Sequence, residues 1–284
     1  MESQLAQLRI VSVVIPVFNR WELTQVCLDS VLKHSVNLKE LWVVDNGSTD
    51  ATPVELQRYA QKFLALGIGF EVIKNAENLG FGRACNQGLR KMTGEYLVVL
   101  NNDTWLMPGW DQALVEQCRR TAADCVGPYF YEKPFVSEAH VLTQASRFIK
   151  RNRLAIRKQF VPILMMFTRG AYERLKIKGR SGEVDSLFDE RFFVTSEDRD
   201  LRERMVRAGM VFLQTGACFI WHRSMGTRAA GKKGGGLSLP STYEQEGLRL
   251  FQEKWGFDPV PLDHTPLAKF KRRWWRLKER FGFL

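Results

Sequence analysis

The chain has 284 residues, which is enough to bury a substantial core as one large domain or two small ones. Hydrophobic residues make up 45% of it and charged residues 26%, which excludes a chain that is disordered, collagen-like or coiled-coil throughout. Lys and Arg number 42 against 31 Asp and Glu, a net charge of +11. This excess predicts an anionic partner: a phosphate-bearing substrate, an anionic lipid or a nucleic acid.

The cysteines and the apolar segments bear on where the protein works. The five cysteines are odd in number and have no zinc-site spacing, so they favour reduced thiols in a cytoplasm. The first residues lack a basic stretch followed by an apolar core, so we expect no signal peptide. The longest apolar runs, such as 161–167, are too short to cross a bilayer. We therefore predict a cytoplasmic protein that does not span a membrane, which leaves open that it lies on one.

Strand and helix patterns alternate through the first hundred residues. Apolar runs predict buried strands, periodic segments predict helices, and Thr52 before Pro53 predicts a helix N-cap. The expected strands are 10–17, 41–44, 69–74 and 95–100, and the expected helices are 21–33, 52–66 and 81–92. Such alternation predicts an α/β fold, a Rossmann-like and mostly parallel sheet with helices on both faces.

After Trp110 the pattern is weaker. It predicts strands over 159–168, 210–214 and 217–221, and helices over 171–175 and 198–208. Four glycines and two lysines in 231–236 indicate a mobile loop, and the prolines of 259–266 indicate a linker that ends the core.

Polar residues follow the predicted strands of the first half. Asn19, Asp45, Asn78 and Asp103 each come just after a strand or the turn that follows it. In open α/β sheets, ligands bind at the carboxyl ends of the strands. These four side chains are therefore expected to converge on one edge of the sheet.

Seven short motifs occur in a specific order. They are Val-Ile-Pro-Val-Phe-Asn-Arg (14–20), Val-Val-Asp-Asn-Gly-Ser-Thr-Asp (43–50), Asn-Leu-Gly-Phe-Gly-Arg-Ala-Cys-Asn-Gln-Gly-Leu (78–89), Leu-Asn-Asn-Asp-Thr (100–104), Phe-Asp-Glu-Arg-Phe-Phe (188–193), Ser-Glu-Asp-Arg-Asp-Leu (196–201) and Trp-His (221–222). In this order the chain resembles the family 2 inverting glycosyltransferases of the GT-A fold, over roughly residues 10–225. The third motif is most similar to bacterial rhamnosyl- and galactofuranosyl-type transferases that build surface polysaccharide.

The resemblance implies a site for a sugar nucleotide. Asp45 is similar to the family aspartate that accepts hydrogen bonds from the base or the ribose. The other residues assigned to the nucleotide are Pro16, Phe18, Asn19, Asn78, Gly82 and Asn102. The alternative for Asp45 is a turn-forming role before Gly47.

The resemblance also implies a divalent cation, Mn²⁺ or Mg²⁺, beside the diphosphate. A cation there would stabilise the charge that grows on the leaving group. Asp103 matches the last aspartate of the family's metal motif, and His222 resembles the histidine that completes the site. Asn101 departs from the motif, since an aspartate usually stands there. The alternative for His222 is a buried histidine beside Trp221.

The acceptor hydroxyl must lose a proton as it attacks, which calls for a carboxylate opposite the leaving group. Asp198 matches the family's catalytic base, and Glu197 is placed next to the acceptor or the base. The alternative is a pair of acids that favours a helix N-terminus, with Ser196 as its cap. Both roles can hold together, and Asp200 is assigned to structure.

A glycine-rich basic loop follows His222. We expect Arg223, Arg228 and Lys232 to close over the diphosphate and exclude water. The alternative is a solvated loop with no such role.

The C-terminal tail is basic and aromatic. Residues 267–284 hold seven Lys or Arg against one acidic residue, and apolar residues recur at spacings of three and four. This pattern favours an interfacial helix on an anionic leaflet over a helix packed on its own domain, with nucleic acid as a weaker third option. The membrane contacts are assigned to Phe270, Arg272, Arg273, Trp274 and Trp275.

The domain organisation follows. We predict one GT-A domain over 1–260, with a nucleotide-binding half at about 10–105 and an acceptor-binding half at about 106–225, and a membrane-associating tail at 261–284. A second basic block, 147–158, contains no acidic residue and could face a lipid diphosphate, the membrane or only solvent.

The functional prediction is a metal-dependent inverting glycosyltransferase, hexosyl- or rhamnosyl-specific, in cell-surface polysaccharide synthesis such as that of lipopolysaccharide. Its donor sugar would be linked to UDP, dTDP or GDP. Its acceptor would be a hydroxyl of a glycan, and we favour a lipid-linked glycan. We expect it on the inner face of the cell membrane and expect no nucleic-acid partner. The alternatives are a nucleotidyltransferase and a non-enzymatic module that binds membranes or polyanions.

Overall fold

The computed structural model describes residues 10–132, 137–180, 182, 184–223 and 241–259. The predicted tail, with Phe270, Arg272, Arg273, Trp274 and Trp275, lies outside the described residues, as do Arg228 and Lys232. None of the described helices is long and apolar enough to cross a membrane.

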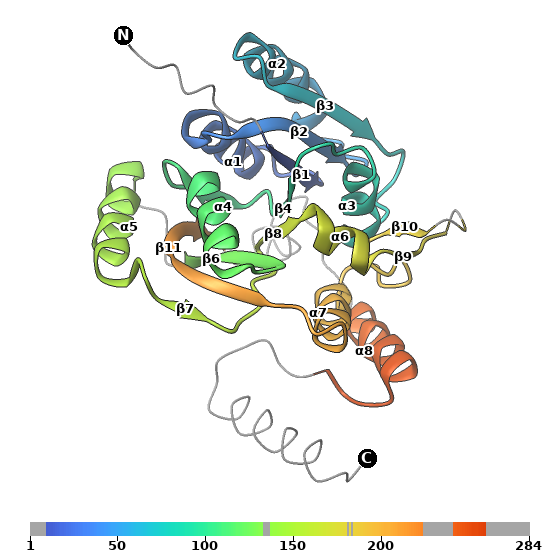
Figure 1. Ribbon diagram of the computed structural model, residues 1–284. Coiled ribbons are helices and arrows are strands. Elements are labelled where there is room, and N and C mark those ends of the chain that lie inside the picture. The colour runs from blue at the N-terminus through green and yellow to red at the C-terminus, as the bar shows by residue number, and fades with distance from the viewer. Residues whose placement is uncertain (1–9, 133–136, 181, 183, 224–240, 260–284) are drawn as a thin grey trace.

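The first half alternates strand and helix as the sequence predicts (Figure 1). Its elements are β1 (Val11–Val17), α1 (Trp21–His34), β2 (Leu38–Asp45), α2 (Thr52–Ala65), β3 (Gly69–Lys74), α3 (Phe81–Leu89) and β4 (Tyr96–Leu100). The N-cap prediction for Thr52 is wrong, because Thr52 is the first helical residue and Ala51 occupies the cap position. The Asp50 carboxylate accepts a hydrogen bond from the Thr52 N–H at 3.0 Å in its place.

The second half mixes short strands with longer helices. Its elements are β5 (Thr104–Leu106), α4 (Trp110–Thr121), β6 (Cys125–Tyr131), α5 (Glu138–Asn152), β7 (Ile156–Arg157), β8 (Leu164–Thr168), α6 (Arg169–Leu175), β9 (Ile177–Lys178), β10 (Val184–Ser186), α7 (Glu197–Arg207), β11 (Phe212–His222) and α8 (Ser241–Trp255). The strand expected over 159–168 and the helices expected over 171–175 and 198–208 are present with shifted ends. The sequence analysis did not identify α4, β6, α5 or α8.

A single large sheet runs through both halves, in the order β3-β2-β1-β4-β8-β6-β11-β5, with β7 also paired to β11. β1, β2, β3 and β4 are mutually parallel, and β6 is parallel to β11. β8 runs antiparallel between β4 and β6, while β5 and β7 run antiparallel to β11. The predicted mostly parallel sheet is therefore confirmed.

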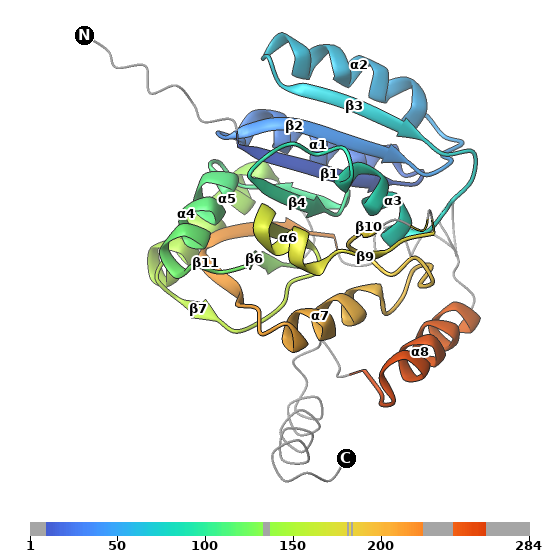
Figure 2. The same cartoon turned by 45° about the vertical axis from the view of Figure 1, so that its right-hand side comes forward.

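The core lies on both faces of this sheet, because side chains alternate along each strand. Val13 and Ile15 face one apolar layer, which includes residues of α1, α2 and α4. Val14 faces the other, which includes residues of α3, α6 and α7. Figure 2 shows helices on either side of the strands, as a doubly wound sheet requires. All five cysteines are buried and unpaired, in agreement with reduced thiols.

The two late strands predicted over 210–214 and 217–221 are one strand, β11. Its register against β6 passes from Thr215 opposite Pro128 to Phe219 opposite Tyr129, so β11 carries extra residues at this point. Gly216 lies in this bulge, where a Cβ atom would come within 2.2 Å of the Asn152 carbonyl oxygen. A glycine inside a strand often marks a bulge or a close backbone approach, whereas the sequence pattern left Gly216 between two predicted strands.

Candidate functional site

The loops after β1 and β2 are tied to each other at the carboxyl edge of the sheet. The Asn19 N–H donates to the Ser48 hydroxyl at 2.8 Å, and the Asn19 side-chain oxygen accepts from the Thr49 N–H at 2.8 Å. Asn19 and Arg20 both have left-handed backbone angles, with φ of 53° and 58°. Pro16 and Phe18, beside Asn19, are half-buried.

Asp45 lies at the end of β2 and is 4% exposed. One of its carboxylate oxygens accepts the Ser48 N–H at 2.9 Å, so the turn-forming role considered for Asp45 is present. That role leaves the carboxylate at the strand end where a nucleotide is expected to bind. The two roles are therefore compatible.

Asn78 belongs to a network of amides that shapes the loop after β3. Its side-chain oxygen accepts from the Asn46 amide at 2.8 Å and from the Gly80 N–H at 2.9 Å. The Asn46 oxygen in turn accepts from Asn75 at 3.0 Å and from the Leu79 N–H at 3.0 Å. In this structure Asn78 fixes the loop that leads into α3.

Gly82 and Gly80 allow this loop and α3 to pack against the segment that precedes α7. A Cβ at Gly82 would lie 2.9 Å from the Phe188 Cβ, and a Cβ at Gly80 would lie 2.1 Å from the Phe193 carbonyl oxygen. Gly80 also has φ of +88°, which L side chains rarely adopt. Close packing thus explains the Gly82 position that we assigned to the nucleotide.

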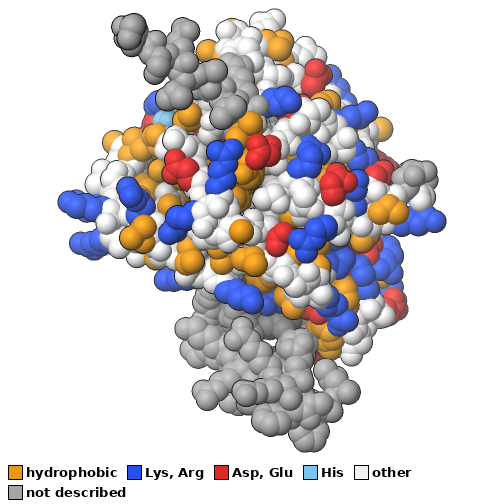
Figure 3. All heavy atoms as spheres, in the orientation of Figure 1, with side chains coloured by type: hydrophobic (Ala, Val, Ile, Leu, Met, Phe, Trp, Pro, Cys, Tyr) orange, Lys and Arg blue, Asp and Glu red, His pale blue; other side chains and the backbone are white. Residues whose placement is uncertain are grey.

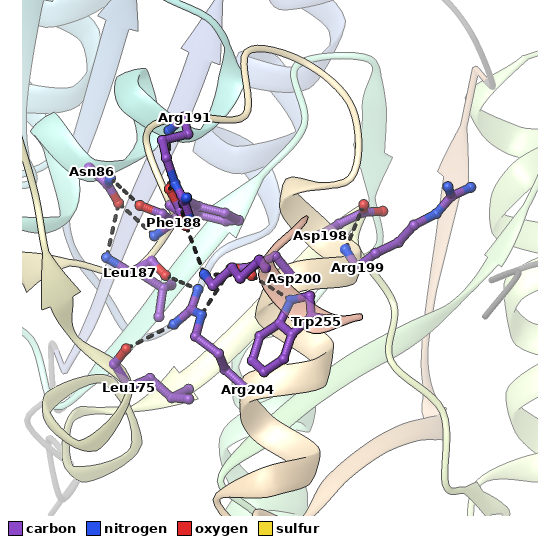
Figure 4. A network of polar contacts seen from close by, with 12 residues as sticks. Asn86, Leu175, Leu187, Phe188, Arg191, Asp198, Arg199, Asp200, Arg204 and Trp255 are labelled. Carbon is purple, nitrogen blue, oxygen red and sulfur yellow. Dashed lines mark hydrogen bonds and ion pairs between the residues drawn. The ribbon is translucent and has the colours of Figure 1, made fainter. Parts of the chain in front are cut away.

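Asn86, which the sequence analysis did not single out, holds the same segment from α3. It is fully buried, and its oxygen accepts the N–H groups of Leu187 and Phe188, both at 3.0 Å. Its amide donates to the Phe188 carbonyl at 2.9 Å (Figure 4) and to the Glu190 carboxylate at 3.1 Å. The sequence signal for this role was an asparagine side chain among the apolar positions of the helix predicted over 81–92.

The predicted catalytic acids stand at the start of α7. Ser196 occupies the cap position with φ of 69°, but no side-chain hydrogen bond caps the helix, so the capping prediction for Ser196 is wrong. Glu197 is 7% exposed and faces α3, where burial and the Glu197 charge raise the pKa of the Cys85 thiol. Asp198 is half-buried, and its carboxylate accepts the Arg199 N–H at 2.8 Å.

Asp200 takes the structural role assigned to it. Its carboxylate is fully buried and accepts hydrogen bonds from Arg204 at 3.0 Å and from the Trp255 indole at 3.0 Å. Figure 4 shows Asp198 pointing away from this network. Neighbouring acids on α7 therefore have different surroundings, and Asp198 is the one left facing outward from the network.

Helix α8 fastens the segment before α7. The Lys254 ammonium lies 2.7 Å from both the Asp189 and the Asp200 carboxylates. Burial alone would raise the pKa of Asp189, but hydrogen bonds from Arg191 and Lys254 hold it far below its usual range. The Arg207 guanidinium stacks 4.6 Å from the centre of a Trp255 ring. Together these contacts fix both ends of the stretch that carries Glu197 and Asp198.

Asp103 and His222 lie side by side because β5 pairs antiparallel with the end of β11, which places Thr104 opposite His222. The His222 Nε2 lies 3.4 Å from an Asp103 oxygen, and both residues are more than nine-tenths buried. The His222 Nδ1 lies 3.0 Å from a Glu132 oxygen. Burial disfavours the charged imidazole, but the carboxylates of Asp103 and Glu132 outweigh it and raise the pKa of His222.

The Asp103–His222 pair fits two ligands of one divalent cation. Oxygen and nitrogen ligands bound at about 2.0–2.2 Å and at right angles are about 3 Å apart, close to the separation seen here. Among the described residues, no three His, Cys, Asp or Glu side chains are grouped to hold a metal. A Mg²⁺ or Mn²⁺ ion that takes few protein ligands completes its shell with water and phosphate oxygens, so two protein donors are compatible with this chemistry.

The neighbouring asparagines are placed differently. The Asn102 amide is buried and donates to the Thr24 hydroxyl of α1 at 2.9 Å, so this side chain faces the protein interior. The Asn101 side-chain oxygen is buried and has no hydrogen-bond partner among the described residues. The Arg223 side chain is exposed. The backbone N–H of Arg223 donates a hydrogen bond to the Asp103 backbone carbonyl at 2.9 Å.

The family assignment rests on a match that covers more than half of the chain. The model of glycosyl transferase family 2 matches residues 12–176. The chain belongs to this family. The matched range includes Asp45, Asn78 and Asp103, and it ends before Asp198 and His222.

Individual relatives agree with this assignment. A putative glycosyltransferase, EpsH of Bacillus subtilis, is 32% identical over 114 residues, which are 40% of this chain and 30% of EpsH. An N-acetylglucosaminyl-diphospho-decaprenol L-rhamnosyltransferase of Mycobacterium tuberculosis is 28% identical over 209 residues, 63% of this chain and 65% of the enzyme. The chain thus matches less than two thirds of the length of either relative.

Solved structures show the same fold. GalNAc-T7 with UDP, GalNAc and Mn²⁺ superposes with a TM-score of 0.58 at 17% identity, over 76% of this chain and 44% of that one. The mannosyltransferase PcManGT of Pyrobaculum calidifontis, in complex with GDP-Man and Mn²⁺, gives a TM-score of 0.55 at 22% identity, over 77% and 59%. The fold prediction, GT-A, is confirmed.

Loss of the Lys254 ammonium should destabilise the protein. Lys254→Met leaves two buried carboxylates without their shared cation, so we expect the free energy of unfolding to fall by about 2–4 kcal/mol. Urea denaturation measures the change, with Lys39→Met as the matched control at an exposed lysine. Equal stability of the two variants would contradict the role assigned to α8.

Asp189 should make stability sensitive to acid. Because its pKa is depressed in the folded protein, it contributes stability above the unfolded value near 3.8 that is lost as the pH falls toward the folded pKa. Between pH 7 and pH 3 the wild type should therefore lose about 1 kcal/mol more than Asp189→Asn. Denaturant titrations of both proteins at the two pH values measure this, and parallel losses would refute it.

Proposed function

We propose that the protein is a metal-dependent inverting glycosyltransferase that moves a hexosyl or rhamnosyl group from a nucleotide donor to a glycan hydroxyl. The observation that carries the proposal is the Asp103–His222 pair at the carboxyl edge of a GT-A sheet. Family membership supports glycosyl transfer over the nucleotidyltransferase and the non-enzymatic module.

The nucleoside end of the donor is assigned to the joined loops after β1 and β2. Asp45 stands there with its turn already formed, and Asn19 locks the two loops together before any ligand arrives. A loop that is fixed in advance loses less entropy when it binds. Pro16 and Phe18 would offer the apolar surface on which the base rests.

The diphosphate end is assigned to Asp103 and His222. A divalent cation held there supplies charge neutralisation for the departing nucleoside diphosphate. The chain's own contribution is to hold the carboxylate and the imidazole together on two paired strands, with Glu132 orienting the imidazole from its other nitrogen. Arg223, Arg228 and Lys232 are proposed to add positive charge on the side of the loop.

Asp198 is assigned as the base. As the acceptor oxygen bonds to the anomeric carbon, its proton passes to the Asp198 carboxylate, and the bond from that carbon to the diphosphate oxygen breaks. Attack opposite the leaving group in one step inverts the anomeric configuration. Glu197, buried against α3, is assigned to positioning this turn of α7.

Substrate classes follow from the relatives only as proposals. The mycobacterial relative is named for a diphospho-decaprenol acceptor, and the two structural neighbours were solved with UDP or GDP-Man and with Mn²⁺. We therefore propose a UDP-, dTDP- or GDP-linked donor, a lipid-linked glycan acceptor and a role in cell-surface polysaccharide synthesis. The tail, 261–284, would hold the enzyme on the inner face of the membrane.

Removal of the base should separate binding from turnover. Asp198→Asn keeps the size of the side chain but cannot accept the proton, so we expect transfer to fall about 10²- to 10⁴-fold while nucleotide binding is unchanged. Release of nucleoside diphosphate in the presence of membrane-derived acceptor measures transfer, and Asp258→Asn at an exposed aspartate is the control. Near-normal turnover in Asp198→Asn would refute the base assignment.

A further inference from the structure

A cationic surface lies on α5 and on the turn and short strand β7 that follow it. Six basic residues occur within 147–158, and no acidic residue occurs from 139 to 172. All six are exposed, and none makes an ion pair with a described residue: Arg147, Lys150, Arg151, Arg153, Arg157 and Lys158. In Figure 3, Lys and Arg side chains gather over α5 at the left edge of the molecule, with hydrophobic side chains among them.

The helix presents these cations in a fixed direction. Arg147, Lys150 and Arg151 are spaced three and four residues apart, so they share one face of α5. The opposite face is anchored in the core, where Val141 is fully buried and the Phe148 ring stacks on Tyr129 with centroids 4.1 Å apart. Because the opposite face of α5 is buried, the helix cannot rotate to bury these three cations.

The turn after α5 and strand β7 are held just as firmly. The Ala155 carbonyl accepts the Gly216 N–H of the β11 bulge at 2.8 Å, and the Ala155 N–H donates to the Asn152 carbonyl at 2.7 Å. Arg157 pairs with Gln214 in the sheet. Because Gly216 has no Cβ, the chain at Asn152 can approach the strand closely.

Two aliphatic side chains stand in this segment between α5 and the end of β7. Leu154 is 73% exposed and Ile156 is 46% exposed. Single exposed aliphatic residues are ordinary on protein surfaces. Here both lie between Arg153 and Arg157, so two cations that make no ion pair with a described residue flank this apolar tip in the sequence.

We propose that residues 147–158 form a preformed docking surface for an anionic lipid bilayer. The cations would lie at the level of the lipid phosphates, and Leu154 and Ile156 would enter the boundary between head groups and acyl chains. A soluble polyanion would satisfy the charges but would leave both aliphatic side chains in water. The apolar tip is therefore what favours a lipid surface, and the proposal does not depend on the glycosyl-transfer reaction or on the C-terminal tail.

A probe at the tip tests insertion directly. All five native cysteines are buried, so Leu154→Cys offers one accessible thiol for an environment-sensitive fluorophore. Val54→Cys on α2, where the native side chain is 58% exposed, is the matched control. With vesicles containing phosphatidylglycerol, the Leu154→Cys label should shift to the blue and brighten, and the Val54→Cys label should not. A Leu154→Cys label that stays in water while the protein cosediments with vesicles would overturn the proposal.

The charges are tested by matched triple variants. Arg147→Gln, Lys150→Gln and Arg151→Gln together remove three charges from the surface. The control, Lys39→Gln, Lys74→Gln and Lys91→Gln, removes three exposed charges elsewhere. Each charge near an anionic surface changes the partition coefficient about fivefold. The first triple variant should therefore bind anionic vesicles more weakly by a factor on the order of 100, and the control triple variant should lose far less. Equal losses in the two triples, or heparin binding that is lost with the first triple while vesicle binding is kept, would contradict the bilayer assignment.

Discussion

The pairing of β5 with the last residues of β11 is the contact on which the candidate site depends. It joins the motif after β4 to a histidine more than a hundred residues later in the chain, because Thr104 lies opposite His222 and the Arg223 N–H binds the Asp103 carbonyl at 2.9 Å. The Asp103 carboxylate and the His222 imidazole are then buried together. Without the antiparallel pairing of β5 with β11, Asp103 would follow β4 with no histidine beside it.

A second constraint sets the position of the candidate catalytic acids. α3 reaches the segment before α7 by close approach at Gly82 and through the four hydrogen bonds of the buried Asn86. From the other side, Lys254 of α8 binds Asp189 and Asp200. The stretch that contains Glu197 and Asp198 is therefore held between α3 of the first half of the chain and α8, the last described helix. Such support is what a general base needs if it is to meet the acceptor hydroxyl in one geometry.

The sequence predicted much of the first half and less of the second, for physical reasons. Buried strands such as β1 and β4 are mostly apolar runs with polar residues at their ends, so local patterns reveal them. The bulge at Gly216 and the burial of Asn86 depend on contacts with residues far away in the chain, which no local pattern contains. α8 was missed because most of its residues are polar or charged, while Lys254 and Trp255, which anchor it, contact acidic residues far away in the chain. Asp103 and His222 could be paired only through the resemblance to a family, and the structure supplies the strand pairing that explains it.

The central claim is that Asp103 and His222 make nucleotide binding depend on a divalent cation, and thermal stability measures this most directly. The wild type would be heated with UDP, dTDP or GDP, each with and without Mn²⁺, beside Asp103→Asn and His222→Gln. One nucleotide should stabilise the wild type by about 2–3 kcal/mol at a hundred times its dissociation constant, only when Mn²⁺ is present, and both variants should lose this effect. Stabilisation that is independent of Mn²⁺, or that survives in both variants, would contradict the assignment of this pair.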